Sequence, residues 1–371
     1  MRLFKLLTEI HSYERFSDFL SDFAISETDL IITIRELYEP LLEAEKLPAT
    51  FLFVGDYTLG EPSDTAIDAM LSDLGDRRYE RVIAIGGGSV IDIAKIFALQ
   101  DVRKSADAFE QRIPIVKDKE LIILPATCGT GSEVTNISIA LLEERGVKMG
   151  LAHDAIAADK AVLIQDTLRG LPFKPYACSA IDALVHAMES YLSPKANPYT
   201  ELFAKEAMRL ILRVFCAINK NGKEARMDYL NDILMASNMA GISFGNAGCG
   251  AVHAMSYPLG GVYHVPHGES NYQFLIEVFR TYERKEPNGK IRQLNAYLAS
   301  LLNTEEDKAY DALAEVLDQL IKRNPLHEYG MKEEEIESFA DSVIANQQRL
   351  LANNYVALSR DEIRDIYQSL Y

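Results

Sequence analysis

The chain has 371 residues, and its 55 acidic side chains outnumber its 38 basic ones to give a formal net charge of −17. This length predicts two domains, and a composition of 48% hydrophobic and 25% charged residues excludes a disordered or collagen-like chain. The acidic balance argues against a nucleic-acid or membrane partner, because anionic phosphates repel such a surface, and no stretch approaches the roughly 20 apolar residues of a transmembrane helix.

The amino-terminal residues and the cysteines indicate the compartment. Residues 1–9 have no long apolar core and no small-residue cleavage pattern, so they do not resemble a secretory signal. The cysteines are scattered without a CxxC pair, as expected for reduced thiols. They are Cys128, Cys178, Cys216 and Cys249. We therefore expect a soluble, cytoplasmic protein.

Up to about residue 165, strand-like and helix-like segments alternate. The predicted strands are short apolar runs at 30–34, 51–54, 81–85, 121–124 and 161–164. Helical patterns occupy about 36–45 and 64–74, and Ser63 is a plausible N-cap of the second. Continuous apolar strands separated by helices predict a parallel sheet covered on both faces. Residues 143–146 predict the turn of a β-hairpin.

After residues 171–172 the pattern changes, and strand signals almost vanish. Helical periodicity marks segments at about 175–192, 199–218, 226–245, 267–284, 291–301, 306–322 and 333–350. The sequence therefore predicts an α/β domain with a parallel sheet over residues 1–168 and an all-helical domain over residues 169–371.

A glycine-rich turn, Gly86-Gly87-Gly88-Ser89, connects the strand at 81–85 to a helical segment. Backbone N–H groups in such a turn can approach a phosphate, and the helix dipole adds roughly half a positive charge there. The pattern is not the GxGxxG fingerprint, because the third glycine position holds Ile91. The turn thus predicts a phosphate site, and the alternative is a glycine-rich turn without a ligand.

A second turn, residues 124–133, follows the next strand and is rich in small hydroxylated residues, including Thr127, Thr130 and Ser132. The carboxyl ends of parallel strands are where α/β folds bind ligands. Two such turns on one sheet favour a dinucleotide over a mononucleotide. The alternative is that these hydroxyl groups only cap turns.

An aspartate and three histidines form a possible metal site. Asp182 and His186 are four residues apart in a mostly apolar helical segment, so they share a face and need partners there. Taken alone, the two residues are better explained as a satisfied His–Asp pair in the core. His253 and His267, from a glycine-rich stretch downstream, would complete a set of one oxygen and three nitrogen ligands suited to Fe²⁺ or Zn²⁺.

In chain order, these motifs resemble the iron-containing (group III) alcohol dehydrogenase family. The matching features are Gly86–Ser89 with Asp92 and Lys95, Thr127 with residues 129–133, Asp182-x3-His186, and His253-x13-His267-Gly268. Each motif is moderately specific, but all four in this order are highly specific and cover about residues 28–275. The resemblance implies a Rossmann-like, dehydroquinate synthase-like dinucleotide domain followed by a helical domain that binds a metal ion.

The resemblance also assigns roles to individual residues. The implied ligands of Fe²⁺ or Zn²⁺ are Asp182, His186, His253 and His267. The implied contacts to a nicotinamide cofactor, NAD with NADP not excluded, are Gly86, Gly87, Gly88, Ser89, Asp92, Thr127, Thr130, Ser132 and Lys148.

The chain departs from the family pattern at two places. Many members carry a second histidine four residues after His253, often assigned to proton transfer, where this chain has Tyr257. Tyrosine, with an unperturbed pKa near 10, is a poor general base at neutral pH. His264 is therefore the candidate to relay a proton, with Tyr257, or to bind a substrate carboxylate. The acidic residue that favours NAD corresponds to Ile34, which leaves cofactor choice open.

The implied activity is hydride transfer between an alcohol and the nicotinamide, with the metal as a Lewis acid. The runs 256–258 and 263–269 resemble a branch of the family that interconverts 4-hydroxybutyrate and succinate semialdehyde, so we expect a small carboxylated substrate. Two alternatives remain: a dehydrogenase of uncharged short-chain aldehydes or diols, and a nucleotide- or metal-binding protein without turnover. The resemblance further implies a homodimer or larger homo-oligomer.

Overall fold

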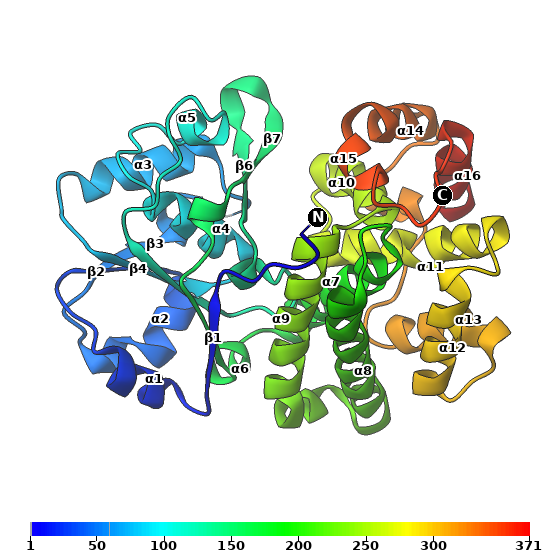
Figure 1. The fold of residues 1–371 in the computed structure, drawn as a ribbon, viewed down its shortest axis with the longest axis horizontal. Coiled ribbons are helices and arrows are strands. Elements are labelled where there is room, and N and C mark those ends of the chain that lie inside the picture. Colours follow the sequence, from blue (N-terminus) through cyan, green and yellow to red (C-terminus); the bar gives the residue numbers. More distant parts are fainter. Residues whose placement is uncertain (1, 59) are drawn as a thin grey trace. The chain divides into compact units, whose positions relative to one another are not determined.

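The structure is a computed structural model that describes residues 2–58 and 60–371. The chain forms an α/β unit from Leu6 to Leu171 and a helical unit from Pro172 to Tyr371, which also includes residues 2–5. Both units are drawn in Figure 1. The division falls after Leu171, slightly beyond the boundary at residues 168 and 169 that the sequence predicts.

A six-stranded sheet forms the centre of the α/β unit, and all its strand pairs are parallel. This confirms the predicted fold class. The strand order is β1-β8-β5-β4-β2-β3. The bounds are β1 Glu9–Tyr13, β2 Asp29–Thr33, β3 Thr50–Phe53, β4 Arg81–Gly86, β5 Glu120–Pro125 and β8 Lys160–Ile164. The sequence did not predict β1, because this edge strand is mostly exposed and has no apolar run.

Successive residues of each strand point to opposite faces, and both faces are buried. In β2, Leu30 and Ile32 enter a core with Ile91, whereas Ile31 enters the other core with Phe19. The helices of this unit are α1 Phe16–Phe23, α2 Arg35–Leu41, α3 Asp64–Leu74, α4 Gly88–Phe97, α5 Ser105–Phe109 and α6 Asp166–Arg169. Its 3-10 turns are Glu43–Glu45, Val54–Asp56, Ser132–Val134, Glu143–Arg145 and Asp154–Ile156.

Two local predictions in this unit can be compared with the structure. Ser63 caps α3, since its hydroxyl accepts a hydrogen bond from the backbone N–H of Ala66 at 3.2 Å. The helix predicted at 36–45 is shorter, because α2 contains Pro40 and ends at Leu41.

The predicted β-hairpin is confirmed. Strands β6 (Ile137–Leu142) and β7 (Val147–Ala152) pair in antiparallel fashion, and Gly146 takes a positive φ of 61° in the turn. The hairpin packs against α3, α4 and α5 of the same unit.

The helical unit has at its centre three long helices, α7, α8 and α9, which lie side by side in Figure 1. Its helices are α7 Phe173–Leu192, α8 Pro198–Asn221, α9 Leu230–Ala247, α10 Ala251–Tyr263, α11 His267–Lys285, α12 Lys290–Leu302, α13 Ala309–Asp318, α14 Glu335–Asn346, α15 Gln348–Leu351 and α16 Arg360–Leu370. The 3-10 turns are Lys223–Tyr229, Glu306–Lys308 and Leu326–Tyr329.

Two helices of this unit were not predicted. Helix α10 contains Pro258, Gly260 and Gly261, which are poor helix formers, and packing of its buried residues offsets that cost. Helix α16 begins with a capping box in which Ser359 and Glu362 bond to each other's backbone N–H groups. In the part of the chain described, no helix has the length and apolarity needed to cross a membrane.

Candidate metal centre and nucleotide-binding turns

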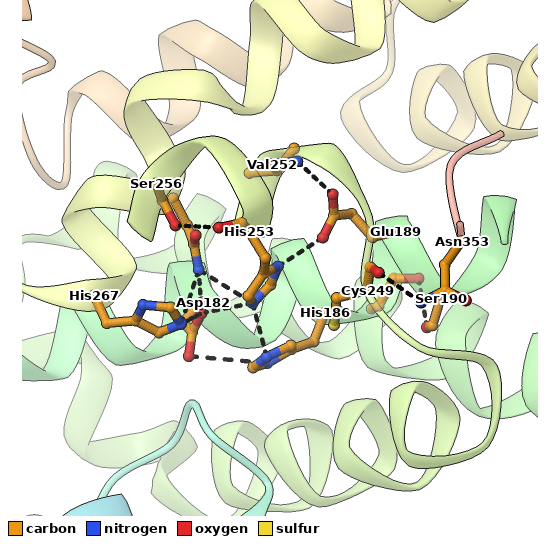
Figure 2. A network of polar contacts seen from close by, with 12 residues as sticks. Asp182, His186, Glu189, Ser190, Cys249, Val252, His253, Ser256, His267 and Asn353 are labelled. Carbon is orange, nitrogen blue, oxygen red and sulfur yellow. Dashed lines mark hydrogen bonds and ion pairs between the residues drawn. The ribbon is translucent and has the colours of Figure 1, made fainter. Parts of the chain in front are cut away.

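The four predicted metal ligands come together in the helical unit, from three helices. Asp182 and His186 lie one turn apart on α7, His253 lies in the first turn of α10, and His267 is the first residue of α11. Figure 2 shows their polar ends converging. Asp182, His186 and His253 are buried, whereas the side chain of His267 remains 44% exposed. The cluster is therefore fixed in the core and accessible at His267.

The distances between donor atoms suit a small divalent ion. Asp182 Oδ1 lies 3.7 Å from both His253 Nε2 and His267 Nε2, and its Oδ2 lies 3.9 Å from His186 Nδ1. His186 Nε2 and His253 Nε2 are 3.0 Å apart. Ligands at about 2.0–2.2 Å from a tetrahedral ion lie roughly 3.3–3.6 Å from one another. The donor set thus fits a metal ion after small side-chain adjustments.

Asn271, which the sequence analysis did not identify, lies among these donors. Its amide nitrogen donates to Asp182 Oδ1 at 2.7 Å and lies 3.2 Å from His253 Nε2 and 3.3 Å from His267 Nε2. Its buried Oδ1 has no hydrogen-bond partner among the described residues. A buried polar atom without a partner is costly. Turning the amide by 180° would exchange its two ends and direct this oxygen, in place of the nitrogen, toward a cation bound among the donors. The residues present therefore fit a metal ion.

The electrostatics of Asp182 also favour a cation. Burial by itself raises the pKa of Asp182, but the neighbouring His186, His267 and His253 and the amide of Asn271 outweigh burial and lower this pKa below its ordinary value. The carboxylate is accordingly ionised at neutral pH, as a metal ligand must be.

Glu189 is a second residue that the sequence analysis missed. It lies on α7 beyond His186, and its Oε2 is 2.6 Å from His253 Nδ1 while its Oε1 accepts the backbone N–H of Val252 at 2.7 Å. Burial disfavours a charge on His253, but Cys249 and Glu189 raise the pKa of His253 well above its ordinary value. Glu189 therefore orients the ring, directs Nε2 toward the cluster and makes the imidazole a stronger donor. In the sequence, the position of Glu189 three residues after His186 was the feature that could have identified it as part of the site.

The two predicted catalytic residues differ in their placement. Tyr257, on α10, is partly buried, and its ring centroid lies 6.0 Å from that of His267. Burial raises the pKa of Tyr257 above 10, so its hydroxyl stays protonated. His264 is exposed and ends α10 in the left-handed region, with a φ of 54°. Tyr257 thus adjoins the cluster, whereas no contact between His264 and the four ligands is found among the described residues.

The two predicted nucleotide-binding turns lie together in the α/β unit. They follow the neighbouring strands β4 and β5, where Gly86 pairs with Pro125. A Cβ atom on Gly87 would lie 3.0 Å from the Cγ2 of Thr127, and one on Gly88 would lie 3.0 Å from that of Thr130. The backbone of the first turn therefore packs directly on the side chains of the second.

Helix α4 begins in this place without a side-chain cap. Ser89 and Ser132 are partly exposed beside it, and the hydroxyl of Thr130 accepts the backbone N–H of Ser132 at 3.3 Å. Uncapped N–H groups at a helix start attract an anion, and the hydroxyl groups add hydrogen-bond donors. The arrangement can thus hold the phosphates of a nucleotide.

Two other residues predicted to bind the cofactor are engaged elsewhere. Asp92 Oδ2 accepts the backbone N–H of Ile139 at 3.0 Å, which ties α4 to the hairpin, and burial raises the pKa of Asp92 to about 6. Lys148, on β7, pairs with Glu61 at 2.5 Å. Their contacts to a cofactor stay predictions.

Lys95, in the same family motif, is fully buried in the α/β unit. Its Nζ donates to Thr135 Oγ1 at 3.2 Å and to the carbonyl oxygen of Ile137 at 2.5 Å. Burial lowers the pKa of Lys95 to about 8. These contacts join the last turn of α4 to the start of the hairpin.

Comparisons with known proteins complete the description. The family profile "Iron-containing alcohol dehydrogenase" matches residues 6–165, and "Fe-containing alcohol dehydrogenase family, C-terminal" matches residues 176–371. The chain is 52% identical to 4-hydroxybutyrate dehydrogenase of Clostridium kluyveri over 371 residues, all of both chains. It is 35% identical to long-chain-alcohol dehydrogenase 1 of Geobacillus thermodenitrificans over 309 residues, 80% of this chain and 76% of the relative.

A solved structure shares the fold. Sulfoacetaldehyde reductase from Bifidobacterium kashiwanohense, in complex with NAD+, matches with a TM-score of 0.86 at 23% identity, over 99% of this chain and 98% of its own.

Proposed function

This chain belongs to the iron-containing alcohol dehydrogenase family, and we propose that it interconverts 4-hydroxybutyrate and succinate semialdehyde with NAD as the hydride carrier. The observation that carries the proposal is the convergence of Asp182, His186, His253 and His267 on one point of the helical unit. The choice of substrate is supported by the full-length relative from Clostridium kluyveri, which is named for this reaction.

The four converging side chains would bind Fe²⁺ or Zn²⁺. When bound, the ion would supply Lewis acidity to the substrate oxygen. The chain contributes the geometry: Glu189 fixes the His253 ring, Asn271 holds Asp182, and Phe244 stacks on His186 with ring centroids 4.1 Å apart. Because Glu189 and Asn271 are buried and Phe244 is partly buried, the donors are held in place before any ligand arrives.

The glycine turn and its neighbouring threonines would hold the pyrophosphate of the dinucleotide. We favour NAD over NADP because of Arg35, which begins α2 two residues after the end of β2. Its guanidinium forms two hydrogen bonds to Asp56, at 2.7 and 3.2 Å, and lies over the ring of Phe53. A cation already paired with a carboxylate is a poor partner for the additional phosphate of NADP.

Tyr257 and His264 would carry the hydroxyl proton toward solvent. The Tyr257 hydroxyl can accept one proton while passing on another, and the imidazole of His264 is exposed to the solvent that would receive the proton. We expect His264→Ala and Tyr257→Phe to lower turnover while the bound metal per chain stays at the wild-type level. Unchanged turnover in both variants would exclude this route.

A carboxylated substrate needs a cationic partner, and we infer that Arg349 of the helical unit supplies it. It is exposed on α15, which packs against α10, and its charge lowers the pKa of Tyr257 against the larger opposing effect of burial. Its guanidinium is therefore close enough to influence the charge of Tyr257, whose ring adjoins that of His267. We assign Arg349 to the substrate carboxylate.

A substrate comparison tests the assignment. For protein loaded with Fe²⁺ or Zn²⁺, we expect kcat/KM for succinate semialdehyde to exceed that for butyraldehyde by about 100-fold or more, because the uncharged aldehyde leaves the cation unpaired. Arg349→Gln should remove most of this preference. Similar values in the wild type would favour a dehydrogenase of uncharged aldehydes or diols, and absent turnover with both cofactors would favour a binding protein.

The remaining parts of the proposal concern assembly and location. We propose a homo-oligomer, at least a dimer, in the cytoplasm. Edge strand β1 supports self-association, since an open strand edge can pair with another chain and Ile10 on it is 40% exposed. Light scattering of the purified protein should give at least twice the mass of one chain, and the mass of a single chain would contradict this.

A further inference from the structure

Cys249 lies in the short turn between α9 and α10, four residues before His253. Asparagines near the C-terminus hold this turn. The Asn353 amide donates to the carbonyl oxygen of Cys249 at 3.0 Å, and Cβ atoms on Gly248 and Gly250 would lie only 2.4 Å from Asn353 and 2.9 Å from Asn354. Gly248 also has a positive φ of 81°. The position of the Cys249 backbone is therefore closely specified.

The thiol of Cys249 adjoins two of the metal-ligand histidines. Its Sγ and one ring nitrogen each of His186 and His253 all lie within 4.8 Å of one another, and the three residues are buried. In the view of Figure 2, the histidine pair lies between Cys249 and His267. The histidines thus have an oxygen donor, Asp182, on one side and a sulfur donor on the other.

We propose that Cys249, His186 and His253 form a second donor set, for a thiophilic divalent ion such as Zn²⁺ or Co²⁺. It shares His186 and His253 with the four-residue set proposed above, in which the donor atoms of Asp182, His253 and His267 also lie within 4.8 Å of one another. Glu189 engages Nδ1 of His253, which leaves one ring nitrogen for an ion. The two sets therefore exclude each other, and one ion is bound at either of two positions.

The chemistry of the donors separates the two positions. Thiolate sulfur selects soft and borderline ions, whereas carboxylate oxygen suits harder ions such as Mn²⁺ and Fe²⁺. When the ion binds Cys249, the S–H bond breaks, the sulfur keeps the electron pair and donates it to the metal, and the proton leaves to solvent. This inference deepens the proposed function, because it concerns the same site and predicts that the ion supplied decides which position is filled.

Cobalt spectroscopy of the full chain tests the proposal. Thiolate-bound Co²⁺ has a charge-transfer absorption in the near ultraviolet that carboxylate and imidazole ligands do not produce. After removal of metal and addition of one equivalent of Co²⁺, the wild type should show this band. Cys249→Ala and Cys249→Ser should lose it, and Cys216→Ala, which alters an exposed cysteine on α8, should keep it. His267→Ala should also keep it, since His267 belongs only to the other set.

Affinity provides a second readout. We expect Cys249→Ala to weaken Zn²⁺ binding by about tenfold or more, as loss of even an outer-sphere partner does, and to leave Mn²⁺ binding unaltered. A wild type without the band, or a band that survives in both Cys249 variants, would overturn the proposal. Turnover is measured separately: an active wild type without the band contradicts only the second donor set, whereas a band without turnover contradicts only the proposed function.

Discussion

The proposed metal site and the proposed nucleotide-binding turns differ in the groups that would bind a charged ligand. The cluster uses side chains from α7, α10 and α11 that are buried apart from His267 and are joined by hydrogen bonds such as that from Asn271 to Asp182. The turns use backbone groups after β4 and β5. They require glycine at positions 87 and 88, because a side chain there would press on the neighbouring threonines. The first site depends on which atoms are present, and the second depends on which atoms are missing.

This difference predicts how each site fails. Loss of one donor atom or its support should weaken the metal site without altering its shape. Added volume should block the nucleotide site although no chemical group is lost. The two kinds of damage should also be separable, because each unit has its own core.

The largest effect is expected for Asp182→Asn. The amide removes the only anionic donor among the four ligands, so metal per chain after dialysis should fall to near zero and turnover should drop roughly a thousandfold, the scale of several kcal/mol of Lewis-acid stabilisation. Metal analysis and NADH absorbance measure the two quantities. Asp228→Asn, at an exposed site, serves as the control. A variant with normal metal content would show that Asp182 is not a ligand.

Glu189→Gln tests the residue that supports His253 and leaves all four proposed metal ligands in place. The glutamine keeps the shape but removes the charge behind His253, so we expect metal affinity to fall by about 10- to 100-fold. Titration against a competing chelator measures it. Glu277→Gln, on α11 outside the cluster, is a matched control. Equal affinities in wild type and Glu189→Gln would mean that Glu189 only stabilises the start of α10.

Gly88→Val tests the effect of added volume at the glycine turn. A side chain here would press on Thr130, and overpacking costs about 1–3 kcal/mol, so the KM for NAD should rise by about tenfold while metal content stays normal. Gly170→Val is the control, because a Cβ at Gly170 meets nothing within 4 Å. If the KM for NAD is unchanged, the glycine turn does not bind the cofactor.

The smallest effect is expected for Asp56→Asn. The substitution frees Arg35, an exposed cation whose pairing with Asp56 is weak because solvent screens it, so the ratio of NADP to NAD activity should increase by about two- to fivefold. The increase should vanish when Arg35→Ala is added. An increase that persists in the double variant would require another explanation of cofactor preference.

The sequence predicted the elements of the fold well wherever the hydrophobic pattern of a segment matches its burial in the structure. Strands β2, β4, β5 and β8 are continuous apolar runs because both of their faces are covered, and the hairpin turn was marked by Gly146. Prediction failed for β1, which lies at the sheet edge, and for α10, whose glycines and proline are tolerated only because neighbouring helices bury it.

The residue types and spacing also identified most of the candidate site. Asp182 and His186 are readable as a pair because four residues make one helical turn. No local rule links them to His253 and His267, and that link came from the family pattern. Glu189, Asn271 and Cys249 were missed because an acid or an amide in a buried helix, or a thiol in a buried turn, has many ordinary roles.

The sequence by itself predicted most of the strands and helices, the glycine turn and, through the family resemblance, four candidate metal donors. The strands, helices and turn follow from periodicity and turn chemistry, which operate over a few residues. Only the tertiary structure decided that Glu189 supports His253, that Asn271 lies among the donors and that a cysteine adjoins the same histidines. Such contacts depend on how α7, α10 and α11 pack, and packing distances between helices are not encoded in any short stretch of the chain.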